Sequence, residues 1–325
     1  MKRREFITLL GTAVLVWPTV VAQAQHRWRI GHLLIGTPES FGHIATALET
    51  RLADLGYVAG QTITIINQYA IPQPEILEAT INALLPDVDL LVVWGTISGV
   101  MAKRLAKSLP VVFMSVSFPV ELGLVASLPH PGGNMTGITF EAAHETNAKR
   151  LQILKEILPS ITRIAVLGAS GDPNVGFAMA SLQQASSGLG VTLALVEMKS
   201  ADSLSEVFTE MESTQTEALI VIPGALTYVN RKTIADLAIG HHLPSCHAFA
   251  ETVADGGLVS LGPDLVAMTY EGAAYIDKII RGAKPAELPV QQPTRYELHL
   301  NLKTAKTLGL TIPDFLLVRA DEVIE

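Results

Sequence analysis

The sequence of 325 residues is poor in cysteine and in charged side chains. Its one cysteine, Cys246, excludes an internal disulfide. Charged residues make up 17% of the chain, and the formal net charge is −8. Such an acidic protein is a poor candidate for binding nucleic acid or anionic lipid. Hydrophobic residues make up 49%, which is enough for the packed cores of two domains.

The sequence also lacks the short motifs of common enzymes. It contains no G-x-x-x-x-G-K-[ST], no G-x-S-x-G and no strand-linked G-x-G-x-x-G. We therefore expect no catalytic residues and no cofactor. An exported α/β enzyme stays open as an alternative, because an enzyme can work without any of these motifs.

The segment HHLPSCH is the best metal-site candidate, with His241, His242, Cys246 and His247 close together. The two adjacent histidines are expected to end a helix, whereas Cys246 and His247 are expected to end a strand. Alternate residues of a strand face opposite sides, so these side chains do not easily converge on one ion. We expect a buried thiol beside a loop histidine, and no metal.

The first residues, MKRREFITLLGTAVLVWPTVVAQAQ, are predicted to be a secretory signal. A basic start and a short apolar run precede Ala22-Gln23-Ala24, which predicts cleavage after Ala24 and a signal over residues 1–24. The stretch Arg3–Ile7 also resembles the twin-arginine export consensus, and export by the general route is the alternative. We expect no anchor, because the sequence has no later run of about 18 apolar residues and no cysteine at the cleavage site. We expect a freely soluble periplasmic protein.

From Trp28 onward, short apolar runs alternate with helical patterns, which predicts an α/β fold with parallel sheets. The predicted strands form two sets of four: Trp28–Leu34, Thr62–Asn67, Leu90–Trp94 and Val111–Met114, then Arg163–Leu167, Thr192–Glu197, Ala218–Ile222 and Leu243–Cys246. The two sets resemble each other, since RIGHLLIGTPESFGHIATALETRLADLGYV is echoed by RIAVLGASGDPNVGFAMASLQQASSGLGVT. This indicates a duplicated domain with two Rossmann-like lobes, and chance similarity between βαβ units is the alternative.

The lobes are predicted to join near Gly137–Ala142, after the turn-rich PHPGGN. One lobe then comprises residues 25–139 plus about 262–285, and the other comprises residues 140–261 plus about 286–325. A tail that returns to both lobes makes a hinge of several strands. Such a hinge suits closure around a ligand.

The loops that follow the predicted strands form the predicted ligand site, because ligands of an open parallel sheet lie outside the carboxyl ends of its strands. These loops are GTPES, GTIS and SVSFP in the first lobe, and GASGDPN, PGALTY and HAFAE in the second. The predicted ligand-binding residues are Thr37, Ser40, Gly95, Thr96, Ser115, Ser117, Phe118, Asn174, Gly224, Tyr228 and Phe249. The alternatives are helix capping for the hydroxyls and core packing for Phe249.

Each type of side chain in these loops suggests a role. Tyr228 and Phe249 are expected to pack on both sides of an apolar or aromatic ligand, and Asn174 is expected to hydrogen-bond its polar end. Asp172 is interpreted as a turn residue. The loops contain no Arg or Lys. A ligand carboxylate would therefore be held by N–H groups and hydroxyls.

Several longer segments resemble the tryptophan/tyrosine-type substrate-binding proteins of ABC transporters. They are MKRREFI, PVELGLVASLPHPGGN, AKRLQILKEILP, GGLVSLGP and LPVQQPTRYELHLNLKTAKTLGLTIP. The resemblance implies the type I periplasmic binding fold and capture of a small molecule between two lobes. It also implies delivery to a cognate ABC permease in the inner membrane, without chemistry. We expect a monomer, and a sensor that feeds a membrane receptor is the alternative.

Two positions depart from this family. Its members often have an acidic residue where Phe118 stands, and Trp-Arg where Phe249-Ala250 stand. The missing carboxylate removes one partner for a ligand ammonium. The sequence therefore favours a small, flat carboxylate or an aromatic acid over an amino acid.

Overall fold

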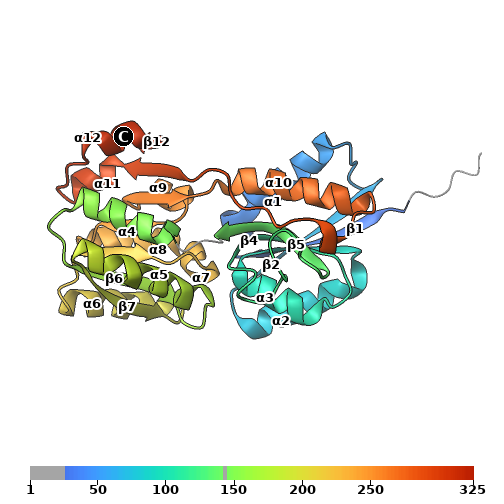
Figure 1. Cartoon of the computed structure of the whole chain (residues 1–325), viewed down its shortest axis with the longest axis horizontal. Helices are drawn as coiled ribbons and strands as arrows, with labels where there is room; N and C mark the ends of the chain where they lie inside the picture. The colour runs from blue at the N-terminus through green and yellow to red at the C-terminus, as the bar shows by residue number, and fades with distance from the viewer. Residues whose placement is uncertain (1–25, 142–144) are drawn as a thin grey trace, which may run out of the picture.

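The computed structural model describes residues 26–141 and 145–325, and these form two lobes with one sheet each (Figure 1). The predicted signal lies outside the described residues. The first sheet is parallel in the order β2-β1-β3-β4-β5. Its strands are β1 (Trp28–Ile35), β2 (Ile63–Ala70), β3 (Leu90–Trp94), β4 (Val111–Ser117) and β5 (Met135–Glu141).

The second sheet has the order β12-β11-β10-β9-β8-β6-β7. Its pairs are parallel except β10 with β11. Its strands are β6 (Arg163–Ala169), β7 (Thr192–Met198), β8 (Ala218–Val221), β9 (Ser245–His247), β10 (Val259–Gly262), β11 (Glu297–Asn301) and β12 (Glu322–Ile324). The order β7-β6-β8-β9-β10 repeats the order of the first sheet. The two lobes therefore share one topology, as the predicted pair of Rossmann-like lobes requires.

All eight predicted strands are present, one with the predicted ends and seven with shifted ends, and the two predicted sets did not include β5, β10, β11 or β12. Much of the predicted joint, Gly137–Ala142, belongs to β5, which pairs with β4 at the edge of the first sheet. Gly137 has φ 153°, and a Cβ there would lie 1.9 Å from the carbonyl oxygen of Phe113. A glycine at this position therefore allows a close approach of the two strands.

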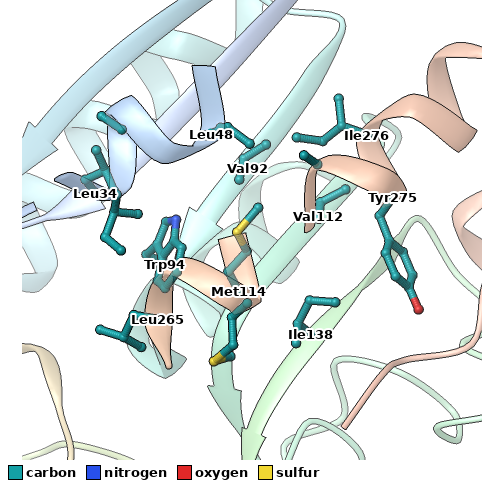
Figure 2. Close-up of a cluster of buried hydrophobic side chains, with 14 of the residues drawn as sticks. Leu34, Leu48, Val92, Trp94, Val112, Met114, Ile138, Leu265, Tyr275 and Ile276 are labelled. Atoms are coloured by element: carbon teal, nitrogen blue, oxygen red, sulfur yellow. The ribbon is translucent and has the colours of Figure 1, made fainter. Parts of the chain in front are cut away.

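Helices cover both faces of the first sheet (Figure 1). They are α1 (Pro38–Asp54), α2 (Pro74–Leu84), α3 (Thr96–Leu105) and the late helix α10 (Leu265–Ile280). The last of these packs on α1, β4 and β5, although it follows the second lobe in sequence. Figure 2 shows the resulting core, in which Leu265 and Ile276 of α10 lie among side chains of the sheet such as Trp94 and Met114.

The second lobe carries the remaining helices of the described chain. They are α4 (Glu145–Ile157), α5 (Asn174–Leu189), α6 (Leu204–Ser213), α7 (Ala225–Val229), α8 (Arg231–Gly240), α9 (Ala250–Ala254), α11 (Leu302–Thr307) and α12 (Asp314–Arg319). Short 3-10 turns occur at Leu85–Asp87, Ala201–Ser203 and Pro285–Glu287. Among the residues that the structure describes, no helix has the length and hydropathy needed to cross a membrane.

The chain passes between the lobes after β5, after β10 and after α10. On the last passage, Gln291 runs beside β5, donating to the carbonyl of Gly137 (3.0 Å) and accepting from the N–H of Thr139 (2.9 Å). A fully buried Arg150 of α4 lies 3.6 Å from the Glu141 carboxylate at the end of β5. Several segments therefore tie the two lobes together.

Candidate functional site

A small cavity of about 50 Å³ lies between the lobes. It is lined by Ile35, Phe41, Trp94, Gly95, Thr96, Ser115, Ser117, Phe140 and Leu265 of the first lobe, and by Asn174, Pro223, Gly224, Ala225, Tyr228 and Phe249 of the second. Most of these residues follow the carboxyl ends of parallel strands, which is where ligand sites of doubly wound sheets occur. A volume of this size holds only a few water molecules.

Three of the predicted residues, Thr37, Ser40 and Phe118, do not line this cavity. The first two form a capping box at the start of α1. The Ser40 N–H donates to the Thr37 hydroxyl (3.4 Å), and the Thr37 N–H donates to the Ser40 hydroxyl (2.9 Å). The ring of Phe118 is buried 4.7 Å from the ring of Phe177 of α5. It therefore packs across the two lobes.

The first-lobe wall is built around the start of α3. Gly95 has φ 82°, which lets the chain turn sharply from β3 into the helix. The Thr96 hydroxyl oxygen accepts from the N–H of Ser117 (3.0 Å), so the hydroxyl proton stays available for another acceptor. No side chain in the described part of the chain caps α3. The N–H groups of its first turn therefore suit an acceptor or anion at this point.

Ser115 reaches the same wall through an irregularity in β4. The pairing of β4 with β5 shifts register between Met114 and Val116, and Ser115 has φ 56°. A bulge of this kind re-aims a side chain, and a non-glycine residue in the left-handed region costs about 1–3 kcal/mol. Such backbone strain is common at ligand sites.

Aromatic rings from both lobes enclose the cavity. Phe41 lies 4.9 Å from Tyr228, Phe140 lies 5.0 Å from Phe249, and the Tyr228 and Phe249 rings meet edge to face at 5.4 Å. Of these, only Tyr228 and Phe249 were expected at the site. They do flank the cavity, and much of Phe249 also packs in the core, as the alternative reading had it.

Sequence reasoning missed the other apolar residues of the lining. Trp94 directly precedes Gly95, and Phe41 directly follows Ser40, so both are sequence neighbours of predicted ligand-binding residues. Phe140 lies on the unpredicted strand β5, and Leu265 starts the helix α10. Nothing local in the sequence marked these two, because tertiary packing brings them to the cavity.

The indole of Trp94 is held by a chain of hydrogen bonds. Its N–H donates to Nε2 of the buried His32 (3.1 Å), and His32 Nδ1 donates to the Asn67 amide oxygen (2.8 Å). The Asn67 amide donates in turn to a Glu49 carboxylate oxygen (2.7 Å). Burial lowers the pKa of His32 to about 4. The imidazole is therefore neutral at pH 7, as an acceptor for the indole N–H must be.

The second-lobe wall contains polar groups with unmet hydrogen-bonding capacity. Asn174 donates from Nδ2 to the carbonyl of Pro223 (3.0 Å), but its buried Oδ1 has no partner among the described residues. The buried Tyr228 hydroxyl is also without one. Burial raises the pKa of Tyr228 above its usual value, so the phenol keeps its proton.

Asp172 lies directly behind this wall. It forms the predicted turn, since its Oδ1 accepts from the N–H of Asn174 (2.9 Å). A Cβ at Gly224 would lie 2.4 Å from its other oxygen. Burial raises the pKa of Asp172 to about 6, although the Asn174 N–H opposes this. The second lobe therefore places an unpaired acceptor, Asn174 Oδ1, at the cavity beside the Tyr228 hydroxyl, whereas the first lobe supplies hydroxyl and N–H donors.

The residues of HHLPSCH do not gather. Cys246 and His247 are buried in β9, where His247 Nε2 lies 2.9 Å from the Ser245 hydroxyl. His241 instead lies 3.3 Å from Glu212 at a helix end. In the described part of the chain, no group of three or more His, Cys, Asp or Glu side chains is placed to hold a metal ion.

Comparison with known proteins gives relatives along most of the chain. The "Tyrosine-binding protein" of Clostridioides difficile (strain R20291) is 23% identical over 260 residues, which are 80% of this chain and 74% of that protein. An ABC domain in complex with L-Trp from Streptococcus pneumoniae has a TM-score of 0.82 and 24% identity. The match covers 91% of this chain and all of that one.

A conserved domain protein from Vibrio cholerae is also similar in structure. It has a TM-score of 0.85 and 23% identity, and the match covers 92% of this chain and 100% of that chain. The two sheets and the interlobe cavity thus form the type I periplasmic binding fold, and the predicted fold class is confirmed. The sequence model described as "ABC transporter substrate binding protein" matches residues 37–324. With nearly the whole chain matched, the protein belongs to the ABC transporter substrate binding protein family.

Proposed function

We propose that this protein is the periplasmic solute-binding component of an ABC-type importer, and that it captures a small aromatic or other flat carboxylate between its lobes. The observation that carries the proposal is the composition of the cavity. Aromatic rings from both lobes surround it, while the polar lining that the described residues provide is neutral and includes no lysine or arginine. Its shape and chemistry suit a flat apolar body with a polar end.

The first lobe supplies groups for a carboxylate. Thr96 begins α3, whose first N–H groups have no side-chain cap among the described residues, and Ser115 and Ser117 of β4 line the same cavity. Neutral dipoles at a helix amino terminus stabilise an anion without a cationic side chain. The relatives named for tyrosine and solved with L-Trp bind aromatic carboxylates too. An amino-acid-like ligand is therefore within the proposed class.

Capture requires the lobes to move. The cavity of about 50 Å³ is too small to admit an aromatic acid without some separation of the lobes. A ligand that touches both walls binds the closed form better than the open form, and so shifts the population toward closure. The chain segments that cross between the lobes are suited to act as the hinge of this motion.

The rest of the proposal concerns the cellular setting. We infer cleavage of residues 1–24, release of a monomer into the periplasm, and delivery of the solute to a cognate permease. The basic start and the Ala22-Gln23-Ala24 pattern support export, and the family is a solute-binding one. Amino-terminal sequencing of periplasmic material should begin at Gln25. An uncleaved chain in the membrane fraction would contradict this part.

The test of solute capture is a thermal-shift screen of the purified protein against aromatic carboxylates and aromatic amino acids. A solute that binds only the folded state raises the midpoint of unfolding. Small-angle scattering with and without the best solute then measures closure, and chromatography checks that the solute is recovered unchanged. Compaction without turnover supports the proposal. Fixed lobes together with a chemically altered solute would favour an enzyme.

A further inference from the structure

The second-lobe wall contains a buried acceptor that the fold itself does not use. Asn174 begins α5, is 6% exposed and lines the cavity. The Pro223 carbonyl can only accept, so the donating Nδ2 of Asn174 must face it, at 3.0 Å. This fixes the orientation of the amide. Oδ1 is then the atom left without a partner within residues 26–141 and 145–325.

An unpaired buried acceptor is unfavourable, and most such atoms in folded proteins have a partner. The surroundings of Asn174 strengthen its preference for a donor. The Asp172 carboxylate accepts from the Asn174 N–H at 2.9 Å, and the residues described around the cavity include no lysine or arginine to offset its charge. Arg231 lies over the Tyr228 ring outside the lining, and it is paired with Asp255 at 2.8 Å.

We propose that the solute carries a hydrogen-bond donor, a hydroxyl or an amine, which Asn174 Oδ1 receives when the lobes are closed. This inference rests on the proposed function and narrows its solute class. One end of the solute accepts from the first lobe, at Thr96 and Ser115. The flat body lies between the aromatic rings, and the donor faces Asn174 of the second lobe.

The experiment compares matched probes by titration calorimetry on the purified protein. The donor probes are 3- and 4-hydroxybenzoate and 3- and 4-aminobenzoate, and the probes without a donor are benzoate and the two corresponding methoxybenzoates. We expect at least one donor probe to bind at least roughly tenfold more tightly than benzoate and its own methoxy counterpart. A site built to pair a hydroxyl or amine rejects the analogue that lacks it.

Asn174→Leu then assigns the preference to this residue. The variant should weaken the preferred donor probe by at least roughly tenfold and leave benzoate nearly unchanged. A merely structural role would weaken every probe alike. Asn230→Leu is the matched control, because its side-chain amide also donates to a backbone carbonyl, at 2.8 Å from Leu226, but does not line the cavity. The control should keep the preference.

The outcomes distinguish failure of this inference from failure of the proposed solute class. Equal binding of benzoate and the donor probes overturns this inference and leaves solute capture intact, as would be seen if water pairs with Asn174. A preference that survives in Asn174→Leu also overturns it. Failure of every probe to bind overturns the proposed solute class together with the inference. Should Asn174→Leu not fold, the comparison of probes on the unmutated protein still decides.

Discussion

The two lobes share one strand order but prepare their cavity walls differently. In the first lobe the Thr96 hydroxyl and the Trp94 indole are held by internal hydrogen bonds, to the Ser117 N–H and to His32. In the second lobe Asn174 Oδ1 and the Tyr228 hydroxyl are buried without partners in the described chain. The two walls therefore stand on the same frame. The first wall is preorganised, and in our proposal a ligand completes the second.

The largest expected effect comes from removing hydroxyls of the first wall. Thr96→Val and Ser115→Ala each delete a donor for the carboxylate end of the solute. The loss of a hydrogen bond to a charged group costs about 1.5–3 kcal/mol, so each variant should bind at least about tenfold more weakly by calorimetry. Unchanged affinity in both would reduce these residues to structural roles.

The orientation of Trp94 offers a second way to break the first wall. His32→Leu leaves the buried indole N–H without its acceptor, which should lower the free energy of unfolding by about 1–3 kcal/mol. Urea denaturation measures this loss. His32→Gln restores an acceptor and should recover part of it.

A spectroscopic readout separates positioning from bulk stability. In a Trp28→Phe background without residues 1–24, Trp94 is the remaining tryptophan of the chain. Its emission should shift in His32→Leu under native conditions. An unchanged spectrum would show that the hydrogen bond does not set the environment of the indole.

The second wall should also differ from the first in how its stability depends on pH, because Asp172 lies behind it. Burial raises its pKa in the folded protein to about 6, above the usual value of about 3.9 for an unfolded chain. The folded state then binds more protons in this window, so the native protein should gain stability relative to Asp172→Asn as pH falls from 7 to 4. Burial lowers the pKa values of His32 and His247 to about 4 and about 3, so these two residues make the folded protein less stable as pH falls.

The measurement is therefore the difference in unfolding midpoint between the native protein and Asp172→Asn across that pH range. Both proteins contain the two histidines, so their contribution cancels in the difference. Asparagine keeps the side-chain oxygen that accepts from the Asn174 N–H. A difference that does not change with pH would contradict the raised pKa.

The smallest effect is expected at the rim, where His43 lies 3.7 Å from Glu251 across the lobes. Their side chains are 40% and 26% exposed. Exposed ion pairs contribute about 0–1 kcal/mol, so His43→Gln should change unfolding in urea by less than about 0.5 kcal/mol. A larger loss would mean that surface charge, and not the aromatic cavity, holds the lobes together.

The sequence by itself determined the repeated β-α frame and the loops at the carboxyl ends of the strands. Apolar periodicity and turn residues act over a few neighbours, so they are readable along the chain. This was enough to place Thr96, Ser115, Asn174 and Tyr228 at one cavity. The ligand role of these residues stays a prediction.

Only the tertiary structure decided which similar side chains face the cavity. Thr37 and Thr96 both stand at helix starts after parallel strands, yet Thr37 caps its own helix while Thr96 lines the site. Phe140 and Leu265 reach the cavity because β5 and α10 pack against distant segments. The unpaired oxygen of Asn174 likewise depends on the position of Pro223. Whether a polar group is satisfied depends on neighbours brought together by folding, which local sequence does not specify.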